Sequence, residues 1–270
     1  MLSQATLEKM TAMKLYGMAQ GFEEQLGKGP YQELSFEERV GFMVDREWTS
    51  REQRRLARRL KAAKLRYPAS IENVDFKTPR GVDRQQLLSL ANCHWIREHQ
   101  NVVLTGPTGI GKSYLACALV EKACRSGFSA YYVRCPRLAH ELAVARGDGS
   151  YVRWLVRLGK VDLLAIDDWL ILPLKESERR DLMEVIEERS ERRSILIASQ
   201  LPVKDWHAAI GDPNLADGIC DRLLHQAHRL SLKGPSMRRP EPSANSSRPT
   251  RGGESGDGDD GDSFPAARLG

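Results

Sequence analysis

The sequence has no long apolar run. Although 41% of its 270 residues are hydrophobic, none of its apolar stretches approaches the roughly 18 residues that a membrane-spanning helix needs. The first twenty residues do not combine a basic start with an apolar stretch, which a secretory signal would require. We therefore expect a cytoplasmic protein with no membrane partner.

Cysteine is also scarce. The five cysteines are odd in number and include no C-x-x-C pair. This pattern excludes a secreted disulfide scaffold and a cysteine-rich zinc module, and it favours a reduced compartment in which the thiols are small buried groups. The sequence shows no internal repeat. Its apolar share is ordinary for a globular chain, so a sizeable core is expected.

Residues 1–67 are predicted to form a small helical domain, because their apolar residues recur at helical spacing. A first helix is indicated by Leu7, Met10, Met13, Leu15 and Met18. The Gly-Lys-Gly-Pro segment at 27–30 interrupts this pattern. Ser35, with Glu38 three residues later, forms a capping box that predicts the start of a second helix.

A third helix, predicted at 51–66, is strongly basic. It has eight basic residues against one acid, or +7, whereas the whole chain carries +5. Its leucines form an apolar stripe, so it can dock while its basic sides face outward. A basic helix alone is usually a solvated face. If this one binds DNA, its contact residues are Arg51, Arg54, Arg55, Arg58, Arg59, Lys61 and Lys64.

Residues 68–240 show a different pattern. Short apolar runs at 101–105, 129–135, 161–167 and 194–199 alternate with helical stretches such as 112–126 and 176–193, and a fifth run lies at 228–232. This alternation predicts an α/β domain with a parallel sheet and crossover helices. Residues 241–270 are rich in Gly, Ser, Pro and Asp, which predicts a disordered tail.

A phosphate-binding loop follows the first of these strands. Residues 106–113 match G-x-x-x-x-G-K-[ST] between a strand and a helix. Its backbone N–H groups would surround phosphate oxygens, Lys112 would reach the β- and γ-phosphates, and Ser113 would hold Mg²⁺. The predicted cofactors are therefore ATP and Mg²⁺. The candidate nucleotide-binding residues are Gly106, Pro107, Thr108, Gly109, Ile110, Gly111, Lys112, Ser113 and Tyr114.

Polar residues end two other predicted strands. Asp167 is placed to hold Mg²⁺ beside Ser113, and Asp168 to orient or deprotonate the attacking water. Ser199 or Gln200 could contact the γ-phosphate or the water, although either could equally cap the strand end. A metal face formed by Asp221, His225 and His228 would need a fourth ligand, and simple exposure explains these residues with fewer assumptions.

Several motifs occur in an order that is typical of one family. They are GPTGIGKSYLACAL, IDDW, ERRDLMEVIEERSERRS, SQLPVKDWH, IGDPNLADGICDRL and LKGPSMR, preceded by SFEERVGFMVDREWTSRE and RRLKAAKLR. Over about residues 1–239 the chain resembles the IstB-like ATPases. These are helper ATPases of insertion-sequence transposons, and they are related to DnaC-type helicase loaders within the AAA+ class.

This resemblance implies a P-loop AAA+ core, a helical N-terminal domain and assembly into homo-oligomers on duplex DNA, with a transposase as partner. It places Asp167 and Asp168 as the Walker B pair, Ser199 as a sensor and Arg222 as the arginine finger. Arg238 resembles a second sensor. Two positions depart from the pattern. Asp168 stands where the class usually has Glu, which fits a slow, switch-like ATPase, and Leu170 stands where the family often has Gly.

Two alternatives remain open at the level of sequence. A helicase loader would have the same core but would bind a replicative helicase. A DNA-binding scaffold would bind nucleotide without releasing phosphate. A P-loop kinase fits less well, since no acceptor-binding segment is evident. The predicted basic helix has no aromatic platform, so contacts to the duplex backbone are favoured over single-strand stacking.

Overall fold

The computed structural model of the protein describes residues 2–27 and 30–237. These residues belong to one compact unit. The predicted tail at 241–270 and the candidate sensor Arg238 lie outside the described residues.

A five-stranded parallel sheet forms the centre of the fold, in the order β2-β3-β4-β1-β5. The predicted α/β architecture is therefore confirmed, including the fifth strand. The strands are β1 (Val102–Thr105), β2 (Ala130–Arg134), β3 (Leu163–Trp169), β4 (Ser194–Ser199) and β5 (His228–Ser231). Because all strands run in one direction, their carboxyl ends meet at a single edge of the sheet.

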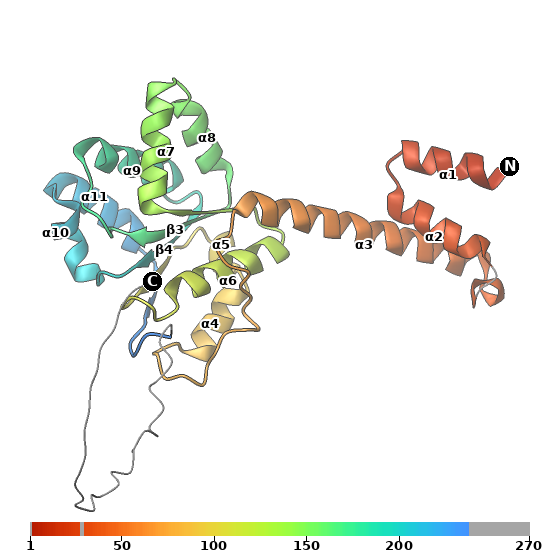
Figure 1. Cartoon of the computed structure of the whole chain (residues 1–270), viewed down its shortest axis with the longest axis horizontal. Coiled ribbons are helices and arrows are strands. Elements are labelled where there is room, and N and C mark those ends of the chain that lie inside the picture. Colours follow the sequence, from red (N-terminus) through yellow and green to blue (C-terminus); the bar gives the residue numbers. More distant parts are fainter. Residues whose placement is uncertain (1, 28–29, 238–270) are drawn as a thin grey trace, which may run out of the picture. The chain divides into compact units, whose positions relative to one another are not determined.

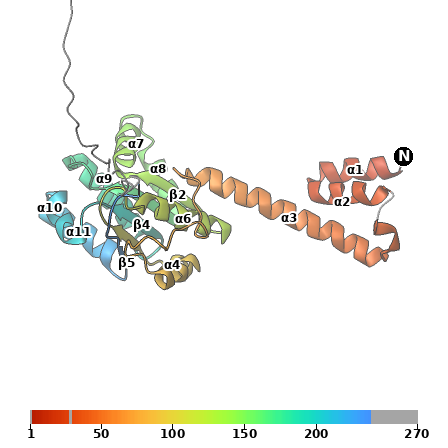
Figure 2. The ribbon, with the colours of Figure 1, turned by 60° about the horizontal axis from the view of Figure 1, so that its bottom comes forward.

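Two helical layers cover the two faces of the sheet (Figures 1 and 2). Side chains alternate along each strand, so that Val102 and Leu104 enter one core cluster and Val103 enters the other. The first cluster is covered by α4 (Arg84–Ala91), α5 (His94–Arg97) and α6 (Lys112–Arg125). The second is covered by α7 (Cys135–Gly147), α8 (Tyr151–Lys160), α9 (Glu176–Arg189), η2 (Val203–Asp205), α10 (Trp206–Ile210) and α11 (Pro213–Leu224).

The N-terminal region is helical as predicted, but its helix boundaries differ from the prediction. The expected first helix is two helices, α1 (Leu2–Ala12) and α2 (Tyr16–Leu26), because Lys14 adopts a left-handed φ of 60° between them. A short 3₁₀ turn, η1 (Pro30–Glu33), follows. The expected second and third helices are one continuous helix, α3 (Phe36–Ala63), which contains no proline to interrupt it.

Helix α3 is held at both ends by contacts that the sequence predicts. The capping box is present at its start: Ser35 Oγ accepts a hydrogen bond from the Glu38 N–H, and the Glu38 carboxylate accepts one from the Ser35 N–H. Near its end, Leu56, Leu60 and Ala63 pack against the core cluster that also contains α6. The apolar stripe of the predicted basic helix therefore docks on the core, as expected.

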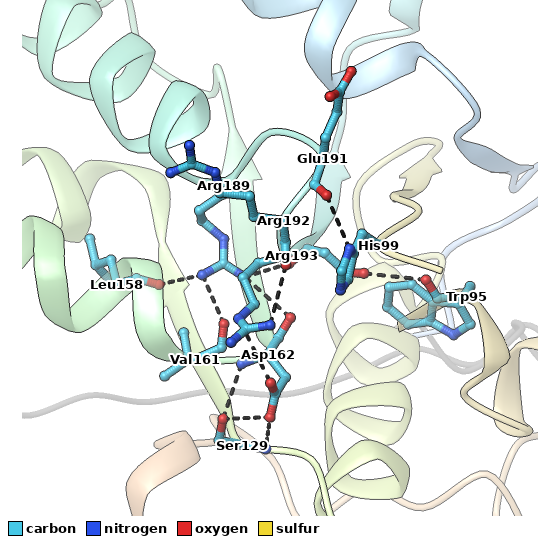
Figure 3. A network of polar contacts seen from close by, with 11 residues as sticks. Trp95, His99, Ser129, Leu158, Val161, Asp162, Arg189, Glu191, Arg192 and Arg193 are labelled. Carbon is cyan, nitrogen blue, oxygen red and sulfur yellow. Dashed lines mark hydrogen bonds and ion pairs between the residues drawn. The ribbon is translucent and has the colours of Figure 1, made fainter. Parts of the chain in front are cut away.

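A buried arginine joins the helical layer to the strands at the edge opposite the strand carboxyl ends. Arg189, at the end of α9, is fully buried, and its guanidinium donates hydrogen bonds to the carbonyl oxygens of Leu158, Val161, Asp162 and Ser194 (Figure 3). Burial lowers its pKa, and the ring of carbonyl oxygens offsets the lost hydration of the cation. This contact fixes where β3 and β4 begin.

The sequence predicts neither a membrane-spanning helix nor a disulfide scaffold, and the structure can be compared with both expectations. No helix among residues 2–27 and 30–237 is long and apolar enough to cross a membrane. All five cysteines are free thiols, and four of them are buried.

Candidate nucleotide-binding site

The carboxyl ends of the strands surround a cavity of about 550 Å³. The phosphate loop follows β1, the two aspartates end β3, and Gln200 follows β4. The cavity is lined by Arg66, Tyr67, Asn73, Asp75, Arg80, Thr108, Gly109, Gly111, Lys112, Ser113, Tyr114, Arg134, Asp168, Ile171, Gln200 and Met237. The fold thus gathers the predicted nucleotide-binding residues from separate parts of the sequence.

Glycine is required in the phosphate loop by both backbone conformation and space. Gly106 has φ +147°, and a Cβ atom there would lie 2.5 Å from the Leu232 carbonyl oxygen. Gly111 has φ +99°, and its Cβ would lie 2.5 Å from a guanidinium nitrogen of Arg80. Any larger residue would clash with the segment after β5 or with Arg80. The loop can therefore hold its curved conformation only with glycine at these positions.

The polar side chains Thr108 and Lys112 of the loop line the cavity and are held there by hydrogen bonds. The Lys112 ammonium donates hydrogen bonds to the carbonyl oxygens of Gly106 (2.7 Å) and Pro107 (2.8 Å). The Thr108 hydroxyl donates one to Gln200 Oε1 at 2.6 Å, which joins the loop to the end of β4. Lys112 is 7% exposed and lies at the first position of α6, where the helix dipole also favours an anion.

Asp167 is buried and held in place. Its carboxylate accepts a hydrogen bond from the Tyr132 hydroxyl on β2 and another, 2.8 Å long, from the Asp168 N–H. Its side chain is 1% exposed. Burial and the Asp167 carboxylate together raise the pKa of the Tyr132 hydroxyl, so Tyr132 remains a proton donor to this carboxylate.

Asp168 faces the cavity among basic side chains. An Arg66 guanidinium nitrogen lies 3.9 Å from its Oδ2. Burial and the neighbouring Asp167 charge raise the pKa of Asp168 overall, although Arg66, Arg134 and Lys112 act in the opposite direction. Arg66 lies just beyond the end of α3, so the basic segment reaches the candidate catalytic acid.

The oxygen atoms of Ser113 and Asp167 suit Mg²⁺, but a bound nucleotide would have to supply further ligands. Ser113 and Asp167 offer hydroxyl and carboxylate oxygens, which Mg²⁺ prefers, but two protein ligands do not complete an octahedron. No group of three His, Cys, Asp or Glu side chains in the described ranges could hold a metal unaided. This finding also removes the face of Asp221, His225 and His228, because α11 ends at Leu224 and His228 begins β5.

Two of the remaining candidates, Ser199 and Arg222, do not line the cavity, and Arg238 lies outside the described residues. The Ser199 hydroxyl donates to the Trp169 carbonyl at 3.0 Å and accepts from the Leu201 N–H, so it fastens β4 to β3. Gln200, next to it, is the residue that lines the cavity. Arg222 on α11 pairs with Glu187 at 2.5 Å and donates to the Gly218 carbonyl.

Sequence reasoning missed three basic residues of this site. Arg80 is 3% exposed and donates to the carbonyl oxygens of Ile110 and Asp75 behind the phosphate loop. Arg134 ends β2, directly beside Asp167 in the sheet register. For Arg66, the sequence predicts only that it is one of the basic residues of the helix at 51–66. The strand-end position of Arg134 was a usable signal, whereas nothing in the sequence around Arg80 indicates its burial.

The basic residues of α3 do not share one environment. Arg51 and Arg54 both pair with the buried carboxylate of Glu47, at 2.6 and 3.4 Å. Arg55 pairs with Glu52 at 2.5 Å. Among the candidate DNA-binding residues, those that pair with a carboxylate are therefore Arg51, Arg54 and Arg55, in the first part of the basic segment. Among the described residues, no carboxylate lies within ion-pair distance of Arg58, Arg59, Lys61 or Lys64.

Curated proteins with similar sequences are named for insertion sequences. The chain is 50% identical over 239 residues to a protein of Sinorhizobium fredii named as an insertion sequence ATP-binding protein, y4pL. This match covers 88% of the chain and 98% of the relative. The chain is also 46% identical to the protein named as the ATP-binding protein of insertion sequence IS1162 from Pseudomonas fluorescens, over 75% of the chain and 88% of the relative.

Solved structures with a similar fold include a helicase loader and a DnaA protein. The DnaC helicase loader matches 63% of the chain and 100% of its own chain, with a TM-score of 0.52 and 18% identity. AMPPCP-bound DnaA from Aquifex aeolicus matches 65% of the chain and 53% of its own, with a TM-score of 0.54 and 16% identity. At these identities the likeness concerns the fold alone, a P-loop AAA+ core. The model of the family described as IstB-like ATP binding protein matches residues 8–245, so the chain belongs to that family.

Proposed function

We propose that this protein is an ATP-dependent, DNA-binding helper ATPase of transposition. It oligomerises on duplex DNA and recruits or activates the transposase of the same element. The single observation that carries the ATPase assignment is that Lys112 and Ser113, which begin α6, line one cavity with Asp168, which lies on β3. The insertion-sequence names of the similar proteins support the biological setting.

In the proposed mechanism, the phosphates of ATP take the place of the loop carbonyls as partners of the Lys112 ammonium. Ser113 and Asp167 would hold Mg²⁺, which would neutralise charge on the phosphates. Asp168 orients the attacking water and accepts its proton. Gln200 contacts the γ-phosphate from the end of β4, and Ser199 positions Gln200 by fastening that strand. Arg222 stabilises the developing charge at the site of a neighbouring subunit.

A second candidate function is a nucleotide-gated DNA-binding scaffold without significant turnover. The observation that favours it is the ion-pair geometry between Arg66 and Asp168. Asp is one methylene shorter than the Glu that is usual at this position in AAA+ proteins. A short acid held by a cation would contact a water less readily than a free glutamate. Both candidates predict ATP-dependent binding to DNA, and only the first predicts phosphate release.

The test measures phosphate release and association with duplex DNA in the same samples, with ATP and with a non-hydrolysable analogue. We expect Lys112→Ala to lower phosphate release by about 100-fold or more, because the cation that binds the β- and γ-phosphates is lost. Lys122→Ala, on the same helix, is the matched control and should leave phosphate release unchanged. Normal hydrolysis by Lys112→Ala would contradict the site. Nucleotide-dependent DNA binding without phosphate release by the wild type would favour the scaffold.

A further inference from the structure

A basic groove crosses the β2 edge of the sheet, away from the nucleotide cavity. β2 is an edge strand, α3 packs on one face of the sheet and α8 on the other. The groove, of about 460 Å³, lies between these helices over the start of β2. It is lined by Arg55, Arg58, Arg59, Ala62, Ser129, Ala130, Tyr131, Arg157 and Val161.

Four guanidinium groups line this groove, and no acidic side chain does. Three belong to α3, but Arg157 comes from α8, about 100 residues later in the chain. In the described part of the chain, no carboxylate lies within ion-pair distance of Arg58 or Arg157. Arg55 is paired with Glu52, but the other three guanidinium groups repel one another at close range, so the groove favours an anion.

Arg157 is held in position by aromatic rings. Its guanidinium carbon lies 5.6 Å from the ring centroid of Tyr131 and 5.2 Å from that of Trp154. The Lys64 ammonium also lies over the Tyr131 ring, at 5.4 Å. Such stacking restricts a long side chain before any ligand binds, which lowers the entropy cost of binding. A planar guanidinium held in this way suits the paired oxygens of a phosphate.

We propose that this groove binds the phosphodiester backbone of duplex DNA, and that Arg157 is the contact which the ATPase core adds to α3. The inference rests on the proposed function and deepens it, because it names where the DNA backbone crosses the core. A duplex backbone carries closely spaced charges, which match a row of cations better than a single small anion does. The other class of occupant that these charges would accept is an acidic polypeptide, and the test separates the two.

The experiment measures the affinity of full-length protein for a labelled duplex of mixed sequence over a series of KCl concentrations, with the non-hydrolysable ATP analogue and Mg²⁺ present. Four variants are compared with the wild type. They are Arg157→Gln, Arg157→Lys, the matched control Arg153→Gln, and the triple variant Arg55→Gln, Arg58→Gln, Arg59→Gln. Arg153 lies one turn earlier on α8, is exposed and does not line the groove.

We expect Arg157→Gln to weaken duplex binding about 5- to 10-fold and to reduce the slope of log affinity against log salt by about 1, the effect of one lost phosphate contact. Arg157→Lys should restore the wild-type slope. This result would show that Arg157→Gln acts through loss of the positive charge and not through misfolding. Arg153→Gln should change affinity less than 2-fold, roughly. The triple variant should reduce the slope further than Arg157→Gln does.

Three outcomes would overturn the inference. If Arg157→Gln matches Arg153→Gln while the triple variant loses binding, the groove assignment is wrong and DNA binding by α3 stands. If Arg157→Gln changes only the binding of a polyglutamate peptide, the groove binds acidic protein segments. If the wild type does not bind duplex DNA at all, both the groove and the DNA-binding part of the proposed function fail.

Discussion

Asp168 and Leu170, near the end of β3, adopt backbone conformations that are unusual for their residue types. Asp168 has φ +54° and Leu170 has φ +55°, and the fully buried Trp169 lies between them. The left-handed region is unfavourable for residues with a Cβ atom, by roughly 1–2 kcal/mol. Glycine would adopt this conformation without strain, and the structure keeps the left-handed turn with leucine at position 170. Burial of the leucine side chain in the core compensates for the backbone strain.

The variant Leu170→Gly tests whether backbone strain or burial of the side chain has the larger effect on stability at this position. Relief of backbone strain favours the variant by roughly 1–2 kcal/mol. Loss of a buried leucine and a more flexible unfolded chain disfavour it by about 2–5 kcal/mol. We therefore expect a net loss of about 0–4 kcal/mol in the free energy of unfolding, measured by urea titration. Leu172→Ala, at an exposed position, should change it by less than about 0.5 kcal/mol. A variant more stable than the wild type would show that strain outweighs burial.

At the scale of elements, Glu47 connects α3 to the start of α2. Its carboxylate accepts hydrogen bonds from the N–H groups of Gly17 (2.7 Å) and Met18 (3.2 Å) in the first turn of α2. A Cβ on Gly17 would lie 2.7 Å from the Glu47 Cα, so the helices approach closely because Gly17 has no side chain. Burial raises the pKa of Glu47, but hydrogen bonds from Arg51 and these N–H groups outweigh it and the pKa is lowered overall.

We predict that Glu47→Gln destabilises the α2–α3 contact by about 1–3 kcal/mol, because charge-assisted hydrogen bonds are lost. The amide hydrogens of residues 17 and 18 should exchange faster with solvent. Since the folded pKa lies below the unfolded one, the wild-type contribution is complete above the unfolded pKa and is lost as pH falls through the folded pKa. The variant should lack this dependence. Glu52→Gln, which affects only an exposed pair with Arg55, should leave exchange unchanged.

At the scale of the whole molecule, the candidate arginine finger Arg222 lies outside the nucleotide cavity of its own chain. Arg222 does not line the cavity, and its guanidinium contacts Glu187 and Gly218 on the outer helices. In the proposed oligomer it would act at the neighbouring subunit. A mixture of two inactive variants tests this directly, because each supplies the part that the other lacks.

We expect Lys112→Ala and Arg222→Ala to be inactive in phosphate release when each is assayed alone. After mixing in equal amounts and assembling on duplex DNA, roughly a quarter of the interfaces would combine an intact site with an intact arginine. Phosphate release should return to about that fraction of the wild-type rate. No recovery, in a mixture shown to co-assemble, would contradict a role for Arg222 between subunits.

The sequence by itself determined the parts whose signals are local. Hydrophobic runs of strand length predicted the five parallel strands, the capping box predicted the start of α3, and the G-x-x-x-x-G-K-[ST] spacing predicted the phosphate loop. Each is a short-range pattern, because backbone hydrogen bonding and side-chain alternation depend on neighbouring residues.

Tertiary structure decided what depends on residues far apart in the chain. It turned the Ser199 hydroxyl to the backbone while Gln200 entered the cavity, and it brought Arg66 to Asp168. It also divided the basic segment, since Glu47 engages Arg51 and Arg54 whereas Arg157 joins the later arginines. A charge count cannot show this division, because electrostatic interactions depend on distance in space and not on separation along the chain.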